Sequence, residues 1–324
     1  CWDSNPRVEK TLAVNATYNQ AGCNLQLADR LVTVSKNYAQ EVSKKEFGYD
    51  FAELLDIRQK NGNFFGIVNG YDKKLIAPLA GKIERINNYF DGTKFEFYDE
   101  KNIAVKKHNK KEFIKLLSKL ATDDGFKQKM LPLVNFYEFE DISDLAEKSD
   151  SIPMFCATSR LVEQKGYDIA AEAIVKFLKE YKYKEAPIWI LGGAGDVRYF
   201  EYLTKLKDKV AAENPEAARR IFVFRGYKVE FAYAIQLASD FYMMPCRFEP
   251  CGLTQMEAMA KGTLPVAMST GGLVDTIEDG VDGFRTLVFY GENEQVFGSA
   301  ADAKKLTNNV EAFADVLEKS IKVF

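Results

Sequence analysis

Two carboxylates stand eight positions apart in residues 249–262, which read EPCGLTQMEAMAKG. A helix places positions eight apart on nearly one face, because it has ~3.6 residues per turn, so we expect Glu257 on the same side as Glu249, about two turns deeper. Carboxylates at two depths can accept hydrogen bonds from hydroxyl groups at two points of one ligand, such as two sugars. The spacing leaves open that Glu257 simply faces solvent.

The residues between these carboxylates predict an anion site. Pro250 and Gly252 come just before the expected start of a helix, where backbone N–H groups lack intrahelical partners. Those N–H groups and the helix dipole together favour a negatively charged group.

Two cations in residues 159–166, SRLVEQKG, indicate a diphosphate. The Arg160 guanidinium can hold two oxygens at once, and the Lys165 ammonium adds a point charge. The alternative is an ordinary surface pair, which is the commoner fate of these residue types.

Glycine-rich turns occur at LGGAGD (191–196) and STGG (269–272). Neither turn reads GxGxxG or GxxxxGK[ST], so dehydrogenase and P-loop interpretations have no motif support. The amides of STGG suit an oxyanion or a sugar hydroxyl, whereas turn closure alone is the alternative for both segments.

These segments follow apolar stretches that alternate with helical patterns. The predicted strands are 152–159, 186–193, 220–226, 240–246 and 263–269, and the predicted helices are 167–181, 197–214, 230–239 and 253–262. Such alternation indicates a parallel, doubly wound α/β sheet. Ligands bind beyond the carboxyl ends of the strands of such sheets, which is where the segments above lie.

The first half of the chain is less regular. We expect strands at 27–35 and 63–70, a helix at 36–42 capped by Ser35, a connecting segment at 73–110 and an amphipathic helix at 110–121. The lone histidine, His108, lies in a lysine-rich run, and we do not assign it a catalytic role.

Composition excludes several classes of function. The chain has 324 residues, 47% of them hydrophobic, and a net charge of −3, so neither nucleic acid nor an anionic membrane is an expected partner. No apolar run reaches the roughly 18 residues that span a bilayer. Five cysteines without CxxC spacing argue against zinc and a disulfide framework, which favours a reducing, cytoplasmic location. Because the first residue is Cys1, we expect a fragment or a processed chain.

Five segments, in order, closely resemble the glycogen and starch synthases. They are RLVEQKG, GGAGD, RGY, SDFYMMPCRFEPCGLTQMEAMAKGTLP and STGGLVDTIEDGVDGF, and the resemblance extends from residue 27 to residue 284. These enzymes are retaining glycosyltransferases of the GT-B architecture that use ADP-glucose or UDP-glucose. The resemblance implies a Rossmann-like C-terminal domain that binds the nucleotide sugar, at 63–324, preceded at 1–62 by the end of an N-terminal domain and a linker.

The resemblance also implies roles for single residues. Arg160 and Lys165 would bind the donor phosphates, and Glu249 would lie at the transferred glucose and be needed for activity. The other implied substrate-binding residues are Tyr227 at the nucleobase, Cys251, Gly252 and Leu253 at glucose, Thr254 at the diphosphate, Glu257 at the ribose, Gly193 in the GGAGD turn, and Asn69 and Gly70 at the interdomain cleft. No metal or other cofactor is implied.

The implied reaction moves α-glucose from ADP-glucose or UDP-glucose to the non-reducing end of an α-1,4-glucan. Departures from the family leave two alternatives. Glu257 stands where these synthases usually carry Tyr, which is typical of other E-x7-E glycosyltransferases that act on other acceptors. The Lys-x-Gly-Gly motif and the catalytic-site histidine of the family's N-terminal domain are absent, which suits a noncatalytic nucleotide-sugar-binding protein and predicts that this chain alone is incomplete for activity.

Overall fold

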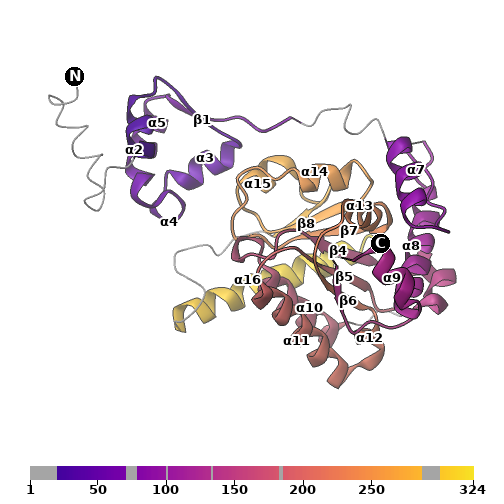
Figure 1. Ribbon diagram of the computed structural model, residues 1–324. Helices are drawn as coiled ribbons and strands as arrows, with labels where there is room; N and C mark the ends of the chain where they lie inside the picture. The colour runs from indigo at the N-terminus through magenta and orange to yellow at the C-terminus, as the bar shows by residue number, and fades with distance from the viewer. Residues whose placement is uncertain (1–19, 71–78, 100, 133, 182–184, 287–299) are drawn as a thin grey trace.

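The chain forms a small N-terminal part and a larger α/β part (Figure 1). The computed structural model describes residues 20–70, 79–99, 101–132, 134–181, 185–286 and 300–324.

The N-terminal part contains short helices around two parallel strands. Its elements are α2 (Gln20–Leu27), β1 (Leu31–Thr33), α3 (Lys36–Val42), α4 (Lys45–Gly48), the 3-10 turn η2 (Tyr49–Phe51), α5 (Ala52–Lys60) and β2 (Phe64–Gly66). The predicted cap is confirmed, since Ser35 Oγ accepts from the Tyr38 amide at 3.1 Å. Both strands are shorter than expected.

The pairing of β1 with β2 bears on the division of the chain. Leu31 lies opposite Phe64 and Thr33 lies opposite Gly66. Strand β2 therefore pairs within the N-terminal part, although the division at 62/63 assigns it to the larger domain. We propose that the boundary lies beyond Gly66.

The expectation of a connecting segment at 73–110 is wrong. Helix α7 (Leu79–Tyr89) lies within it, and α8 (Val105–Thr122) begins five residues before the predicted start at 110. Ile83, Ile86 and Phe90 are buried at helical spacing among charged neighbours, and this short apolar stripe forms the helix-packing face. Helix α9 (Asp124–Met130) follows α8.

A mostly parallel sheet forms the centre of the larger part. Among the described residues its order is β3-β6-β5-β4-β7-β8-β9, and only β3 runs antiparallel to its neighbour. The strands are β3 (Asn135–Tyr137), β4 (Met154–Thr158), β5 (Ile188–Gly193), β6 (Ile221–Arg225), β7 (Phe241–Met244), β8 (Leu264–Ala267) and β9 (Phe284–Arg285). The predicted parallel sheet is confirmed.

Helices cover both faces of this sheet. Met154 and Cys156 of β4 join the core under α7, α8 and α13 (Val229–Ala238). Phe155 and Ala157 point the other way, into the core under three other helices. Those helices are α10 (Tyr167–Glu180), α11 (Val197–Glu213) and α16 (Ala300–Ile321).

The strand order places a switch point between β4 and β7. From β4 the chain moves outward through β5 to β6, then returns to β7 on the other side of β4. The connections leaving β4 and β7 start side by side at the carboxyl ends of adjacent strands and lead to strands on opposite sides. We call this place the crevice, because doubly wound sheets bind their ligands at such a switch point. Short elements line these connections: η4 (Glu163–Lys165), α14 (Thr254–Met259) and α15 (Gly272–Thr276).

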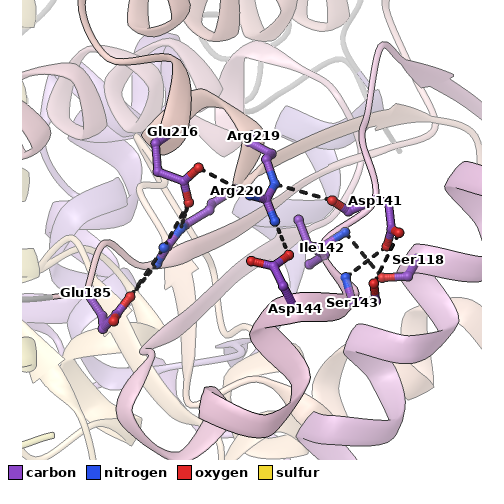
Figure 2. Close-up of polar contacts among 9 residues, drawn as sticks. All are labelled: Ser118, Asp141, Ile142, Ser143, Asp144, Glu185, Glu216, Arg219 and Arg220. Atoms are coloured by element: carbon purple, nitrogen blue, oxygen red, sulfur yellow. Dashed lines mark hydrogen bonds and ion pairs between the residues drawn. The ribbon is translucent and has the colours of Figure 1, made fainter.

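Two arginines brace the opposite end of the sheet (Figure 2). Arg219 is the last residue of α12 (Pro215–Arg219), and Arg220 lies between α12 and β6. Arg219 pairs with Asp144, which follows Ser143 at the start of the 3-10 helix η3 (Ser143–Ser151). Arg220 pairs with Glu216 at 3.0 Å and Glu185 at 3.3 Å. These pairs tie the amino ends of neighbouring strands together, away from the crevice.

Candidate functional site

The connections after β4 and β7 meet at the switch point. The Gln164 side chain donates to Phe248 O at 3.1 Å, and the Arg247 amide donates to Gln164 O at 2.9 Å. These bonds hold the segment that carries the two predicted cations against the segment that carries Glu249.

Glu249 is held between a cation and a thiol. Lys165 Nζ donates to Glu249 Oε2, and both side chains are mostly buried, at 15% and 10% exposure. Cys246 Sγ donates to the same oxygen at 3.8 Å. Burial raises the pKa of the Cys246 thiol to about 12, so the thiol stays protonated and keeps its donor. The carboxylate thus has one defined position at the mouth of the crevice.

Arg160 is placed differently from Lys165. It is exposed, and its guanidinium donates to Gln164 Oε1 at 3.4 Å. Within the described residues no acidic side chain forms an ion pair with it. Its positive charge is therefore uncompensated at the carboxyl end of β4, where an anionic ligand can reach it.

A second ion pair fixes the loop that carries Glu249. Arg247 binds Asp168 with two hydrogen bonds, of 2.9 and 2.5 Å, and donates to Glu163 O at 2.9 Å. Burial opposes the charge of Arg247, but the hydrogen bonds and negative charge of Asp168 raise its pKa above the ordinary value. Sequence reasoning missed this pair. Its only signal was an arginine two positions before Glu249.

Two glycines allow the turns to approach closely. A Cβ atom on Gly166, where φ is +63°, would lie 1.9 Å from Pro245 O. A Cβ atom on Gly193, where φ is +151°, would lie 1.7 Å from Ser159 O. Gly193 is buried, and its lack of a side chain lets the β5 connection touch the backbone beside Arg160.

The helical spacing argument for Glu249 and Glu257 is wrong. Helix α14 begins only at Thr254, because the chain turns at Gly252 with a φ of +71°. Glu249 lies in the preceding loop, so the 3.6-residue period does not relate the two carboxylates. Glu257 is half-buried on α14, and its backbone carbonyl accepts from Lys261 Nζ at 3.0 Å.

Gln255 organises the turn between these carboxylates. Its side-chain nitrogen Nε2 donates to Cys251 O at 3.0 Å, Gly252 O at 2.8 Å and Thr276 Oγ1 at 2.9 Å. The bonds join α14 to α15 and leave the carbonyls of this turn satisfied. Cys251 is buried, Gly252 and Thr254 are half-buried, and Leu253 is exposed.

The STGG turn uses all four of its backbone amides within the protein. The Ser269 amide donates to Thr286 Oγ1 at 3.0 Å, and the Thr270 amide donates to Met268 O at 3.0 Å. The Gly272 amide donates to Glu249 O at 2.8 Å, and the Gly271 amide donates to Glu41 Oε1 at 2.8 Å. The expectation that these amides bind an oxyanion or a sugar hydroxyl is therefore wrong, because each already has an acceptor in the protein.

The remaining predicted residues lie at the margins. Tyr227 lies two residues after the end of β6, in the connection to α13, and is 61% exposed. Asn69 and Gly70 are exposed at the end of the first described stretch, and no described contact joins them to the crevice. His108 lies on α8 with Nε2 2.7 Å from Lys94 O, outside the strand-end turns.

Neither a metal-binding cluster nor a membrane-spanning helix occurs in the described ranges. No cluster of three or more His, Cys, Asp or Glu side chains there could hold a metal ion. None of the described helices combines the length and apolar character needed to cross a bilayer.

Comparisons with known proteins give one consistent result. The profile of the family "Glycosyl transferases group 1" matches residues 152–318. The glycogen synthase of Serratia proteamaculans (strain 568) is 32% identical over 252 residues, which are 78% of this chain and 43% of that protein. The glycogen synthase of Pectobacterium carotovorum subsp. carotovorum (strain PC1) is 32% identical over 263 residues, 81% of this chain and 44% of the relative.

A solved structure also matches. The catalytic domain of starch synthase IV from Arabidopsis thaliana, bound to ADP and acarbose, superposes with a TM-score of 0.54 and 25% identity. The match covers 90% of this chain and 52% of that one. The chain thus spans about half the length of the proteins that it matches.

Proposed function

The chain belongs to the group 1 glycosyltransferases, with the GT-B fold of the glycogen and starch synthases, and we propose that it serves glucose transfer from ADP-glucose or UDP-glucose to an α-1,4-glucan. The family resemblance and fold expected from the sequence are thereby confirmed. The observation that carries the proposal is the pairing of Lys165 with Glu249 at the switch point.

The donor diphosphate would bind at the end of β4. Arg160 offers an uncompensated guanidinium there, and Lys165 lies seven residues after the end of that strand, in η4. Fixed cations stabilise the negative charge that develops on a departing diphosphate without needing to reorganise. The similar starch synthase structure is bound to ADP and acarbose, which supports a nucleoside diphosphate as part of the ligand.

The glucose would lie between Glu249 and the turn before α14. Lys165, the proposed phosphate-binding cation, contacts Glu249, the proposed hydroxyl-binding carboxylate. This suits a nucleotide sugar, in which the diphosphate adjoins the sugar. Transfer would proceed with retention to the non-reducing end of the glucan. Cys251 to Leu253 would contact glucose through their backbone, and Gly193 would line the donor side of the cleft.

The nucleoside end of the donor would extend along the crevice. Tyr227 has enough exposed ring to stack on a base, and Thr254 opens α14 where the diphosphate would reach it. Glu257 would accept from the ribose hydroxyls. Asn69 and Gly70 would face the cleft from the interdomain side.

Two other functions remain candidates on specific grounds. Glu257 completes the E-x7-E spacing and favours a related enzyme with another sugar acceptor. The family's Lys-x-Gly-Gly motif does not occur in this sequence, which favours a noncatalytic domain that binds nucleotide sugars. Transfer assays that offer glucan against small-sugar and lipid acceptors separate the first from glucan synthesis.

Calorimetric titration with ADP, UDP and ADP-glucose tests the donor site in this chain. We expect ADP or UDP to bind, and Arg160→Ala to weaken that binding by about 10-fold or more, because a charge-assisted hydrogen bond contributes ~1.5–3 kcal/mol. Lys205→Ala is the matched control, since Lys205 is exposed in the middle of α11. Absence of binding by all three ligands would remove the donor-site proposal.

Catalysis is tested in the complete enzyme. We expect Lys165→Ala to abolish glucose transfer while the circular dichroism spectrum and melting temperature show a folded protein. Transfer at the wild-type rate in a folded Lys165→Ala enzyme would refute the role of Lys165.

A further inference from the structure

Glu41 connects the N-terminal part to the STGG turn. Its Oε1 accepts from the Gly271 amide at 2.8 Å, and both carboxylate oxygens lie 3.4 Å from Thr270 Oγ1. On the same helix, Asn37 Nδ2 donates to Glu41 Oε1 at 2.8 Å. The partners are about 230 positions apart in sequence, so this contact is tertiary and specific to the fold.

Asn37 makes a second set of bonds to the same region. Its backbone amide donates to Asp275 Oδ2 at 2.8 Å, and its side-chain Nδ2 donates to Gly271 O at 3.2 Å. Glu41 of α3 thus accepts from the turn, whereas Asn37 of α3 donates to the turn and to Asp275 of α15. We call Asn37, Glu41, Gly271 and Asp275 the clasp.

The turn held by the clasp also supports Glu249. The Gly272 amide donates to Glu249 O at 2.8 Å. A Cβ atom on Gly271, where φ is +46°, would lie 1.9 Å from that same oxygen. Successive amides of one turn are therefore bonded to Glu41 on one side and to Glu249 on the other, with no room for the turn to move toward Glu249.

Burying the Glu41 carboxylate costs more desolvation free energy than one hydrogen bond to an amide requires. Burial raises the pKa of Glu41, while the bonds from Gly271, Asn37 and Thr270 work in the opposite direction. Within the described residues no ion pair compensates its charge. A neutral residue would bond one amide with less desolvation, whereas the two carboxylate oxygens reach two successive residues of the turn.

We propose that Glu41 is a positioning residue: through the clasp it fixes the STGG turn, and through the Gly272–Glu249 bond it fixes the backbone of the residue that contacts the transferred sugar. This inference rests on the proposed function of Glu249. It assigns the N-terminal part a role in shaping the sugar end of the donor site, since the diphosphate cations lie on the β4 connection and have no bond to the clasp.

Amide hydrogen exchange tests the clasp without any ligand. In Glu41→Ala we expect exchange at Gly271 to accelerate because its acceptor is gone, and exchange at Gly272 to accelerate at least about 10-fold because the turn is no longer fixed. Glu41→Gln keeps one acceptor oxygen and should give an intermediate rate. Glu53→Ala, at an exposed glutamate of α5, should leave both amides unchanged. Unchanged protection at Gly272 in a folded Glu41→Ala protein would overturn the proposal.

Calorimetry then separates the clasp from the donor site. We expect the Glu53→Ala protein to bind ADP with the same affinity as the wild type, and to bind ADP-glucose with the same affinity as the wild type. In Glu41→Ala the ADP affinity should stay within about twofold, and the ADP-glucose affinity should fall by about 10-fold, because only the sugar end is disturbed. Equal losses for both ligands would overturn the positioning role. No nucleotide binding by the wild-type chain would refute the proposed function, and the exchange rates would still decide the clasp.

Discussion

At the scale of residues, the three cations near Glu249 differ in what holds them. Lys165 contacts the carboxylate itself, Arg247 forms a two-bond ion pair with Asp168, and Arg160 bonds only a neutral amide. Because the charge of Arg247 is compensated by Asp168 and another of its donors binds Glu163 O, we interpret Arg247 as structural. The sequence suggested Arg160 and Lys165 as a phosphate pair, and the contacts explain why Arg247, only two residues before Glu249, should not join them.

Removing Arg247 should strongly destabilise the protein. In Arg247→Met we expect the free energy of unfolding to fall by about 3 kcal/mol or more, because Asp168 stays buried without its partner. Lys176→Ala breaks an exposed pair with Glu180 on α10 and should cost less than about 0.5 kcal/mol. Urea unfolding of both variants measures the difference. Equal, small losses would show that the Asp168 pair is no more than a surface contact.

Gly193 and Gly81 should respond oppositely to alanine. Gly193→Ala forces a Cβ atom against Ser159 O at a positive φ, and we expect a loss of about 2 kcal/mol or more. Gly81 lies exposed in α7 with open space around it, so Gly81→Ala should stabilise the protein by up to about 1 kcal/mol. Thermal unfolding checks both signs, and a neutral Gly193→Ala would mean that the β5 turn can shift away from Ser159.

At the scale of elements, the sequence predicts best where both faces of an element are buried. Strands β4 to β8 read as continuous apolar runs because helices cover both sides of the sheet, and their order of appearance placed Lys165 and Glu249 at one edge. Helix α7 was missed because its described buried face is short: Ile83 and Ile86, with Phe90 just past the end of the helix, stand among polar and charged residues. The start of α14 was predicted to within one residue, at 253 against Thr254, but Glu249 lies before that start, so the helical period could not relate it to Glu257.

Helix α8 should make stability depend on pH. It inserts Lys106 under the sheet, where Nζ donates to Lys261 O at 3.0 Å and to Thr263 Oγ1 at 2.8 Å. Burial lowers the pKa of Lys106 to about 7 from 10.5. Between these values the unfolded chain binds more protons than the folded one, so the free energy of unfolding must rise with pH.

The Lys106→Met variant isolates this contribution. From pH 7 to 8.5 the lysine should add about 1.5 kcal/mol to the stability of the wild-type protein, at up to ~1.4 kcal/mol per pH unit, and this rise should be missing in the variant. Lys107→Met, at an exposed neighbour on α8, should keep the wild-type slope. Urea unfolding at both pH values provides the measurement, and parallel curves for Lys106→Met and wild type would contradict a buried, neutralised lysine.

At the scale of the whole molecule, the two parts have separate cores. The N-terminal cluster of Ala39, Val42, Leu55 and Phe64 shares no member with the two clusters that flank the large sheet. The clasp between α3 and α15 is the best-defined hydrogen-bonded link between these parts in the described chain. The sequence predicted two parts from family motifs, but it could not predict the clasp, because no local pattern relates Glu41 to a glycine about 230 positions away.

Residues 71–324 should therefore fold without the N-terminal part. We expect one cooperative unfolding transition, with a free energy of unfolding about 1–3 kcal/mol below that of the full chain, because the loss is confined to the few hydrogen bonds of the clasp. Residues 1–70 alone should show no cooperative transition, since their described core contains few fully buried side chains. The clasp provides an internal check. Glu41→Ala should lower the free energy of unfolding of the full chain by most of the difference between the full chain and the fragment. If the fragment fails to fold while Glu41→Ala barely affects the full chain, the N-terminal part contributes to the main core through contacts other than the clasp.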